Sequence, residues 1–97
     1  MKKEIVVENA FLPVGSVVML KGATQPVIII GIAPVENGKK KIWDYLAAPY
    51  PIGVISSDKN LLFNNDQIDK VLAEGFSTDE EKLFRMEMEK NIVAIRK

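Results

Sequence analysis

Catalytic chemistry in this chain would depend on hydroxyl, amine and carboxylate side chains alone, because its 97 residues include no cysteine and no histidine. Their absence removes thiolate nucleophiles, cysteine zinc sites, and the commonest general base and metal ligand. A hydroxyl nucleophile would therefore need activation by a lysine or a carboxylate. No nucleophile-elbow pattern surrounds any candidate hydroxyl, so we interpret them all as turn or cap residues: Ser16, Thr24, Ser56, Ser57, Ser77 and Thr78.

Carboxylates give no stronger signal for catalysis or metal binding. Among the carboxylates, only Asp44 lies within an apolar strand pattern, where a charged side chain needs a hydrogen-bond partner. We interpret it as a structural hydrogen-bond acceptor. The oxygen-rich segment 64–69 lacks the glycine and closing glutamate of an EF-hand, so capping is favoured over calcium binding. We expect a protein that is not an enzyme and that holds no metal and no cofactor.

Four aromatic residues form the candidate partner-binding set: Trp43, Tyr45, Tyr50 and Phe63. On a small barrel, such rings could line a groove for an extended peptide or stack on nucleobases. The alternative, which carries more weight, is that they fill the core and its rim. Pro49 and Pro51 restrict the backbone around Tyr50, so a ring there loses little conformational entropy on binding. We expect a protein partner to bind at this rim or along an exposed edge strand.

Composition predicts one globular domain over residues 1–97, with 47% hydrophobic and 27% charged residues. The formal net charge of zero argues against a protein that grips nucleic acid. Only three apolar residues follow Met1-Lys2-Lys3 before the next polar run, which is too short for a signal peptide, and no run is long enough to span a membrane. We therefore expect a cytoplasmic protein.

The fold class we predict is mainly β, a strongly twisted antiparallel sheet or SH3-like barrel, β-rich over 5–76, with one C-terminal helix. Residues 12–33 hold two β-branched runs joined by a glycine-containing connector, which predicts a hairpin. The second run is nearly all apolar, so we expect it to be central or buried on both faces, with a bulge or bend at Gly31. Asn37-Gly38 predicts a second hairpin leading to a strand over 42–48. Residues 1–11 are either an edge strand or an ordered arm.

The C-terminal part of the sequence is less uniform. Val54-Ile55 suggests a short strand, and 66–76 fits either a short helix or one helical turn followed by a strand from about residue 70 to 76. A helix over about 78–95 follows from two overlapping capping boxes, Ser77 with Glu80 and Thr78 with Glu81. We expect one side of it to dock on the sheet through an apolar stripe of Phe84, Met88, Ile92 and Ile95.

Several short motifs occur in a fixed order: Leu12-Pro13-x-Gly15-Ser16-Val17-Val18, Pro26 to Gly31, Trp43-Asp44-Tyr45, Pro49-Tyr50-Pro51-x-Gly53, Phe63-Asn64-x-x-x-Ile68 and Glu74-Gly75-Phe76. Together they resemble the small proteins of the domain-of-unknown-function family 4176, over roughly residues 11–90. That resemblance implies a Gram-positive source and an accessory role beside toxins of the type VII secretion system, as a toxin chaperone or targeting factor. An acidic residue often follows the Tyr-Pro pair in that family, whereas this chain has Ile52 there.

Two other functions fit the same sequence. An immunity protein that binds and blocks a cognate toxin would also be small, cytoplasmic and without catalytic residues. A small-barrel nucleic-acid-binding module is the other alternative, although neutral net charge counts against it. The sequence specifies neither the binding face nor the oligomeric state.

Overall fold

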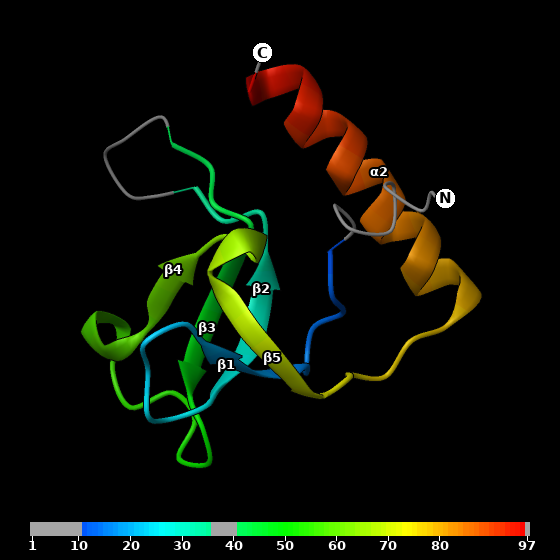
Figure 1. Cartoon of the computed structure of the whole chain (residues 1–97). Helices are drawn as coiled ribbons and strands as arrows, with labels where there is room; N and C mark the ends of the chain where they lie inside the picture. Colours follow the sequence, from blue (N-terminus) through cyan, green and yellow to red (C-terminus); the bar gives the residue numbers. More distant parts are fainter. Residues whose placement is uncertain (1–10, 36–40, 97) are drawn as a thin grey trace.

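The apolar β-branched runs form a five-stranded antiparallel sheet in the computed structural model, which describes residues 11–35 and 41–96, with side chains as far as Ile92 (Figure 1). The strands are β1 (Val17–Leu20), β2 (Val27–Ile32), β3 (Tyr45–Pro49), β4 (Leu61–Phe63) and β5 (Ile68–Ala73). Their order across the sheet is β4-β3-β2-β1-β5, so β4 and β5 are the two edges. The predicted antiparallel sheet is confirmed, and within the described residues it stays open instead of closing into the alternative barrel.

The predicted hairpin over 12–33 forms the centre of this sheet. Strand β1 pairs with β2 through Val17↔Ile28 and Val18↔Val27. The register between β2 and β3 shifts between Ile29 and Gly31, so the bulge expected at Gly31 is confirmed. Of the two predicted alternatives for β2, the central position is confirmed, whereas burial on both faces is not found, because its burial alternates. Val27 and Ile29 are buried, whereas Ile28 is half-buried and Ile30 is exposed, as expected where a central strand covers a core on one face only.

The second hairpin falls partly outside the described residues. Asn37 and Gly38, which carry the turn prediction, lie in the undescribed range 36–40, and the predictions for residues 1–10 also lie outside. An antiparallel bridge between described residues, Val35↔Ile42, flanks the gap. Strand β3 then begins at Tyr45, three residues later than predicted, and continues to Pro49.

Residues 50–76 resolve two open questions. Val54 and Ile55 are not a strand: both are exposed, and they lie before the 3₁₀ helix η1 (Ser57–Lys59). The ambiguous segment is one 3₁₀ turn, η2 (Asn65–Gln67), followed by strand β5. The second predicted alternative, one helical turn followed by a strand, is thereby confirmed, with the strand beginning two residues earlier than predicted; it pairs with β1.

Helix α2 (Asp79–Arg96) ends the described chain, close to the predicted bounds. Its inner face carries Met88, which is half-buried, and Ile92, which is only 4% exposed. Phe84 is 55% exposed, so the prediction that it docks inward is wrong. In that turn Arg85 is the half-buried residue, and its guanidinium donates to the Phe11 carbonyl and the Ser77 hydroxyl. Ile95 lies among the side chains that are not described. No helix within 11–35 and 41–96 has both the length and the apolar character needed to cross a membrane.

A close backbone crossing fixes where β5 leaves the sheet. Gly15 has a φ of +97°, which allows a tight turn in which the Ser16 N–H donates to the Pro13 carbonyl at 3.2 Å. The buried Ser16 hydroxyl donates to the same carbonyl at 2.7 Å and accepts the Gly75 N–H at 3.0 Å. The bond between Gly75 and Ser16 joins residues 59 positions apart and directs the chain from β5 towards α2.

This crossing predicts that alanine substitution costs much more stability at Gly75 than at Gly31. An added methyl group at Gly75 would overlap the Val14 carbonyl oxygen and lie 3.0 Å from the Gly15 carbonyl carbon, whereas one at Gly31 would meet the Leu46 Cβ at an ordinary 3.5 Å. We expect Gly75→Ala to lower the free energy of urea unfolding by about 1–3 kcal/mol, the usual cost of overpacking, and Gly31→Ala to cost clearly less. Equal losses in the two variants would contradict the crossing.

Candidate functional site

The four aromatic residues of the predicted partner-binding set do not gather on one surface. Tyr45 and Phe63 are buried, with 0% and 1% exposure, and their ring centroids lie 5.3 Å apart. Phe11 meets Tyr45 edge-on with centroids 5.8 Å apart, so three rings form the centre of the core. Sequence reasoning assigned Phe11 to the N-terminal segment ahead of the hairpin and did not include it in the aromatic set. The two buried rings are therefore structural, and neither can contact a partner without unfolding.

The Tyr45 hydroxyl joins three separate parts of the chain. It accepts the Leu12 N–H at 2.8 Å and donates to the Asn65 Oδ1 at 2.6 Å. Strand β3 is thereby tied to the segment that precedes β1 and to η2. Because the phenol is buried, loss of its hydration raises the pKa of Tyr45 to about 12. The nearby Asp44 carboxylate contributes to this rise, whereas the Leu12 and Asn65 hydrogen bonds and the Arg85 charge oppose it.

Asp44 completes this buried polar cluster. Its Oδ2 accepts the Asn65 N–H at 2.8 Å, and its own N–H donates to the Asn64 Oδ1 at 2.9 Å. The Asn64 N–H in turn donates to the Gln67 side chain at 2.9 Å. The interpretation of Asp44 as a structural acceptor is confirmed, and the asparagines of the oxygen-rich segment serve η2. No group of three or more carboxylates that could hold a metal ion occurs in the described part of the chain.

The other two aromatic residues lie at opposite ends of β3. Trp43 precedes the strand, is half-buried, and has the Lys41 Nζ 4.0 Å from its ring centroid. Tyr50 follows the strand and is 43% exposed. The five-residue strand β3 lies between them, and at about 3.3 Å per residue it alone spans roughly 15 Å. One rim containing both rings therefore does not exist, although each remains partly accessible by itself.

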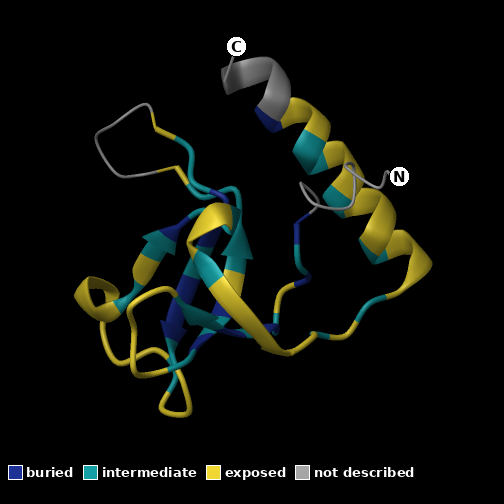
Figure 2. Ribbon diagram, viewed as in Figure 1, coloured by how far each residue is buried: buried dark blue, intermediate teal, exposed yellow. Residues whose placement is uncertain are grey.

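Tyr50 instead belongs to an apolar surface that sequence reasoning missed. Residues 50–55, which we name the apolar turn, form the loop at the bottom of Figure 1, coloured as exposed in Figure 2. Four large apolar side chains in it are exposed: Tyr50 (43%), Ile52 (70%), Val54 (61%) and Ile55 (56%). In the sequence, Pro49 and Pro51 indicated that Tyr50 could be presented to a partner, whereas Val54-Ile55 was predicted as a short strand. The structure leaves both residues unpaired at the surface.

Backbone hydrogen bonds hold the apolar turn at its base. The Tyr50 N–H donates to the Pro26 carbonyl at 3.1 Å, and the Gly53 N–H donates to the Pro49 carbonyl at 2.7 Å. Gly53 has a φ of +88°, a conformation that a glycine adopts without strain. The turn is thus tied to the central hairpin while its side chains face solvent.

The edge strands are less suited to binding than expected. Strand β4 has three residues, and β5 shows two register shifts against β1. Strand β5 also carries the exposed charges Asp69 and Lys70. Short length, bulges and charges are the features by which proteins protect sheet edges from pairing. Side-chain contact at the apolar turn, which includes Tyr50 of the predicted rim, is therefore better supported than pairing along a sheet edge.

Helix α2 is held to the core by a polar clamp of Phe11, Ser77, Glu81 and Arg85. The Arg85 Nη1 donates to the Phe11 carbonyl at 2.5 Å, Nη2 donates to the Ser77 hydroxyl at 3.2 Å, and Nε lies 2.6 Å from a Glu81 carboxylate oxygen. The Ser77 hydroxyl donates to Glu81 at 2.7 Å, so it does not form the predicted box with Glu80. The Glu81 N–H donates to Thr78, the second predicted cap, at 3.1 Å.

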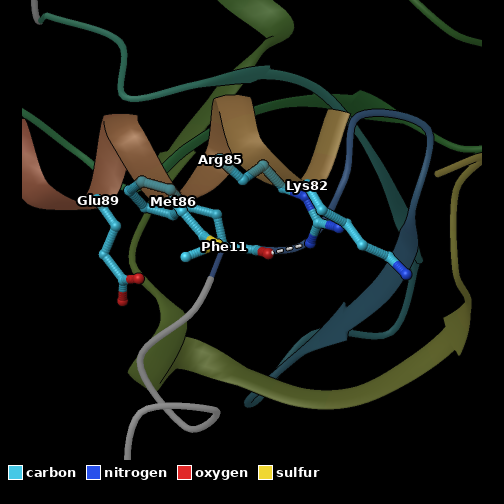
Figure 3. A pocket seen from close by; sticks show the side chains of 5 residues that line it. All are labelled: Phe11, Lys82, Arg85, Met86 and Glu89. Atoms are coloured by element: carbon cyan, nitrogen blue, oxygen red, sulfur yellow. Dashed lines mark hydrogen bonds between the residues drawn. The ribbon is translucent and has the colours of Figure 1, made fainter. Parts of the chain in front are cut away.

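A small pocket lies where the clamp meets Phe11, lined by Phe11, Lys82, Arg85, Met86 and Glu89 (Figure 3). Lys82 and Glu89 stand at its two ends, with Arg85 and its bond to Phe11 between them. Burial raises the pKa of Glu89, and the Asp44 carboxylate adds to the rise. The volume of the pocket is about 170 Å³, below the ~300–1,000 Å³ of ordinary ligand sites. We interpret the pocket as a gap in the packing between α2 and Phe11 and not as a ligand site.

The Tyr45 hydroxyl yields a prediction about stability. Tyr45→Phe leaves the Leu12 N–H and the Asn65 Oδ1 without their buried partner, so we expect the free energy of unfolding at pH 7 to fall by about 1–3 kcal/mol. Tyr50→Phe removes a hydroxyl from an exposed ring and should change it by less than about 0.5 kcal/mol. Urea unfolding of both variants provides the measurement, and an unchanged Tyr45→Phe protein would contradict the bridging role.

The raised pKa of Tyr45 yields a second prediction, about pH. The folded state holds the phenol proton more tightly than the unfolded chain, where tyrosine titrates near ~10. The resulting stabilisation is complete below about pH 10 and is lost as the pH rises through about 12. The stability difference between the wild type and Tyr45→Phe should therefore shrink from pH 10 upwards. A difference that stays constant between pH 9 and pH 12 would refute the shift.

One protein family matches this chain over most of its length. The family described as a domain of unknown function (DUF4176) matches residues 11–84, which include all five strands and the beginning of α2. No curated protein matches the chain, and neither does any solved structure. Because the match covers well over half of the 97 residues, the chain belongs to the domain-of-unknown-function family DUF4176.

Proposed function

We propose that this protein is a non-catalytic accessory factor that binds a protein partner through the apolar turn. The observation that carries the proposal is the exposure of Tyr50, Ile52, Val54 and Ile55 within six consecutive residues. Single exposed apolar side chains are common on soluble proteins, whereas a contiguous group of them marks a surface that another molecule covers. Tyrosine and branched aliphatic side chains together supply the apolar contact area typical of an interface centre.

The backbone of the apolar turn favours binding over simple exposure. Its base is tied to β2 by the bond from Tyr50 to Pro26, and Pro51 restricts the chain within the turn. A partner that covers these side chains therefore has little loop entropy to remove. The same side chains, placed on a loop without such anchors, would lose part of their contact energy to ordering.

The identity of the partner is the finer part of the proposal. Its support is the resemblance of the sequence to small Gram-positive proteins encoded beside type VII secreted toxins. We propose that the partner is such a toxin and that the protein acts as its chaperone or targeting factor in the cytoplasm. An immunity protein would bind the same toxin but would block its active domain, so the two roles differ in what loss of binding does.

Capture of a toxin encoded beside the gene in the native bacterium tests the binding surface. Tyr50→Ala and Ile52→Ser should each weaken capture by about 2 kcal/mol, or roughly 30-fold, the range of interface hot spots. Neither change should shift the urea midpoint by much, because both side chains are exposed. Binding is measured by titrating purified toxin against each labelled variant.

Two control variants make this titration decisive. Val35→Ser removes a side chain that is 64% exposed but lies outside the apolar turn, and Trp43→Ala removes the aromatic residue at the other end of β3. Both should bind the toxin like the wild type if they remain folded. Undiminished binding by Ile52→Ser, or an equal loss in folded Val35→Ser, would contradict the proposed surface.

The role of the binding is tested in cells that carry Ile52→Ser. For a chaperone or targeting factor, the amount of exported toxin should fall while cells survive expression of the toxin's active domain. For an immunity protein, export should continue and survival should be lost. Normal export together with normal survival would contradict both roles.

A further inference from the structure

The apolar turn is a narrow projection, and its shape restricts the kind of surface that can cover it. The Gly53 N–H donates to the Pro49 carbonyl at 2.7 Å, which closes the loop between these two residues. In Figure 1 this loop extends beyond the neighbouring connection between β1 and β2. The exposed fraction rises from 43% at Tyr50, at the anchored base, to 70% at Ile52. Ile52 is therefore the side chain of the turn that the protein itself covers least.

High exposure of Ile52 favours a concave partner over a flat one. A flat surface touches a projecting side chain from one side, so much of the Ile52 side chain would stay in water. An apolar cleft contacts it from several sides and buries the area that the turn leaves uncovered. Hot-spot side chains in protein interfaces accordingly fill pockets from which water is excluded. Tyr50, nearer the base, then keeps its hydroxyl at the wet mouth of the cleft, which suits a ring with one polar end.

The charges around the turn indicate that this cleft is uncharged. Residues 45–57 include no lysine, arginine, aspartate or glutamate, and the next two residues, Asp58 and Lys59, are exposed and of opposite sign. Charged side chains lining the cleft would lose their hydration without gaining a counter-charge, at a cost in free energy. The same lack of net positive charge disfavours an anionic lipid surface, which attracts clusters of lysine and arginine.

A second copy of this chain is a poor occupant at the pocket that the structure describes. That pocket, beside α2, is lined in part by the charged side chains of Lys82, Arg85 and Glu89, and its volume is about 170 Å³. An uncharged turn with several large apolar side chains fits neither the lining nor the size of this pocket. A different protein is therefore favoured as the partner.

We infer that the partner presents an uncharged apolar cleft that receives the apolar turn, with Ile52 inserted deepest and Tyr50 at the mouth. This inference rests on the proposed function, because it names the form of the partner at the same site. It adds that the cleft limits the size of the side chain at position 52, whereas a flat partner would accept a larger one.

Enlarging the side chain at position 52 tests the cleft on the full chain, by titrating the purified toxin encoded beside the gene against labelled variants. Ile52→Trp and Ile52→Phe should each weaken binding at least tenfold, because neither ring fits a cleft shaped for isoleucine. Tyr50→Trp, which enlarges the ring at the mouth, should stay within threefold of the wild type. Val35→Trp adds the same side chain at an exposed position outside the turn and should leave binding unchanged. Urea unfolding checks that each variant is folded.

The size series separates this inference from the proposed function. If Ile52→Ser weakens binding while folded Ile52→Trp and Ile52→Phe bind at least as tightly as the wild type, the partner is flat at this position. That result would overturn the cleft and leave the binding surface standing. If Ile52→Ser leaves binding unchanged, the proposed function itself fails, and the cleft fails with it.

Salt and lipid vesicles test the lack of charge at the site. The ratio of the Ile52→Ser to the wild-type dissociation constant should change less than threefold between about 0.05 and 0.5 M sodium chloride, because screening acts on charged contacts. A tenfold or larger change in this ratio would overturn the uncharged cleft. Wild-type protein should not sediment with vesicles of phosphatidylserine and phosphatidylcholine. Sedimentation that Ile52→Ser abolishes would make the occupant a lipid surface and would also overturn the inference.

Discussion

The buried hydroxyl of Tyr45 is the interaction on which the rest of this structure depends. Strand β3 places the ring between Phe11 and Phe63, and the hydroxyl then bonds to Leu12 on one side and Asn65 on the other. A buried phenol without partners would cost free energy, so each of these segments has to follow the position of the ring. Because Arg85 bonds to the neighbouring Phe11 carbonyl, the location of α2 also follows from it. One side chain thus links the sheet, η2 and the helix.

This arrangement explains why the exposed apolar residues lie where they do. The rings of Phe11, Tyr45 and Phe63 fill the core, whereas Tyr50 and Phe84 are exposed. At one end, β3 runs into the apolar turn, whose base is fixed while its side chains remain free of the core. At the other, the polar clamp occupies the inner side of the first turns of α2 and leaves Leu83 and Phe84 outside. Both groups of side chains are therefore exposed.

Local patterns in the sequence were sufficient for most of the fold. The β-branched runs around Gly22 predicted the β1–β2 hairpin, Gly31 marked the bulge, and Thr78 with the acidic turn after it located the start of α2. Which residues of an element face the core could not be predicted in the same way. Phe84 shares helical spacing with Ile92, yet the polar bonds of Arg85 decide which residue faces inward. Tyr45 and Tyr50 are the same residue type five positions apart, and only the register of β3 makes one a core ring and the other a surface ring.

The central claim is that a folded, unaltered core presents the apolar turn to a protein partner. Amide hydrogen exchange of the full chain, alone and saturated with the toxin encoded beside its gene, tests this claim most directly. The account predicts that exchange slows at residues 52–55 on binding, while the amide of Leu12, bonded to Tyr45, keeps the protection it has in the free protein. Protection that appears only at β5, or a loss of protection at Leu12, would contradict it.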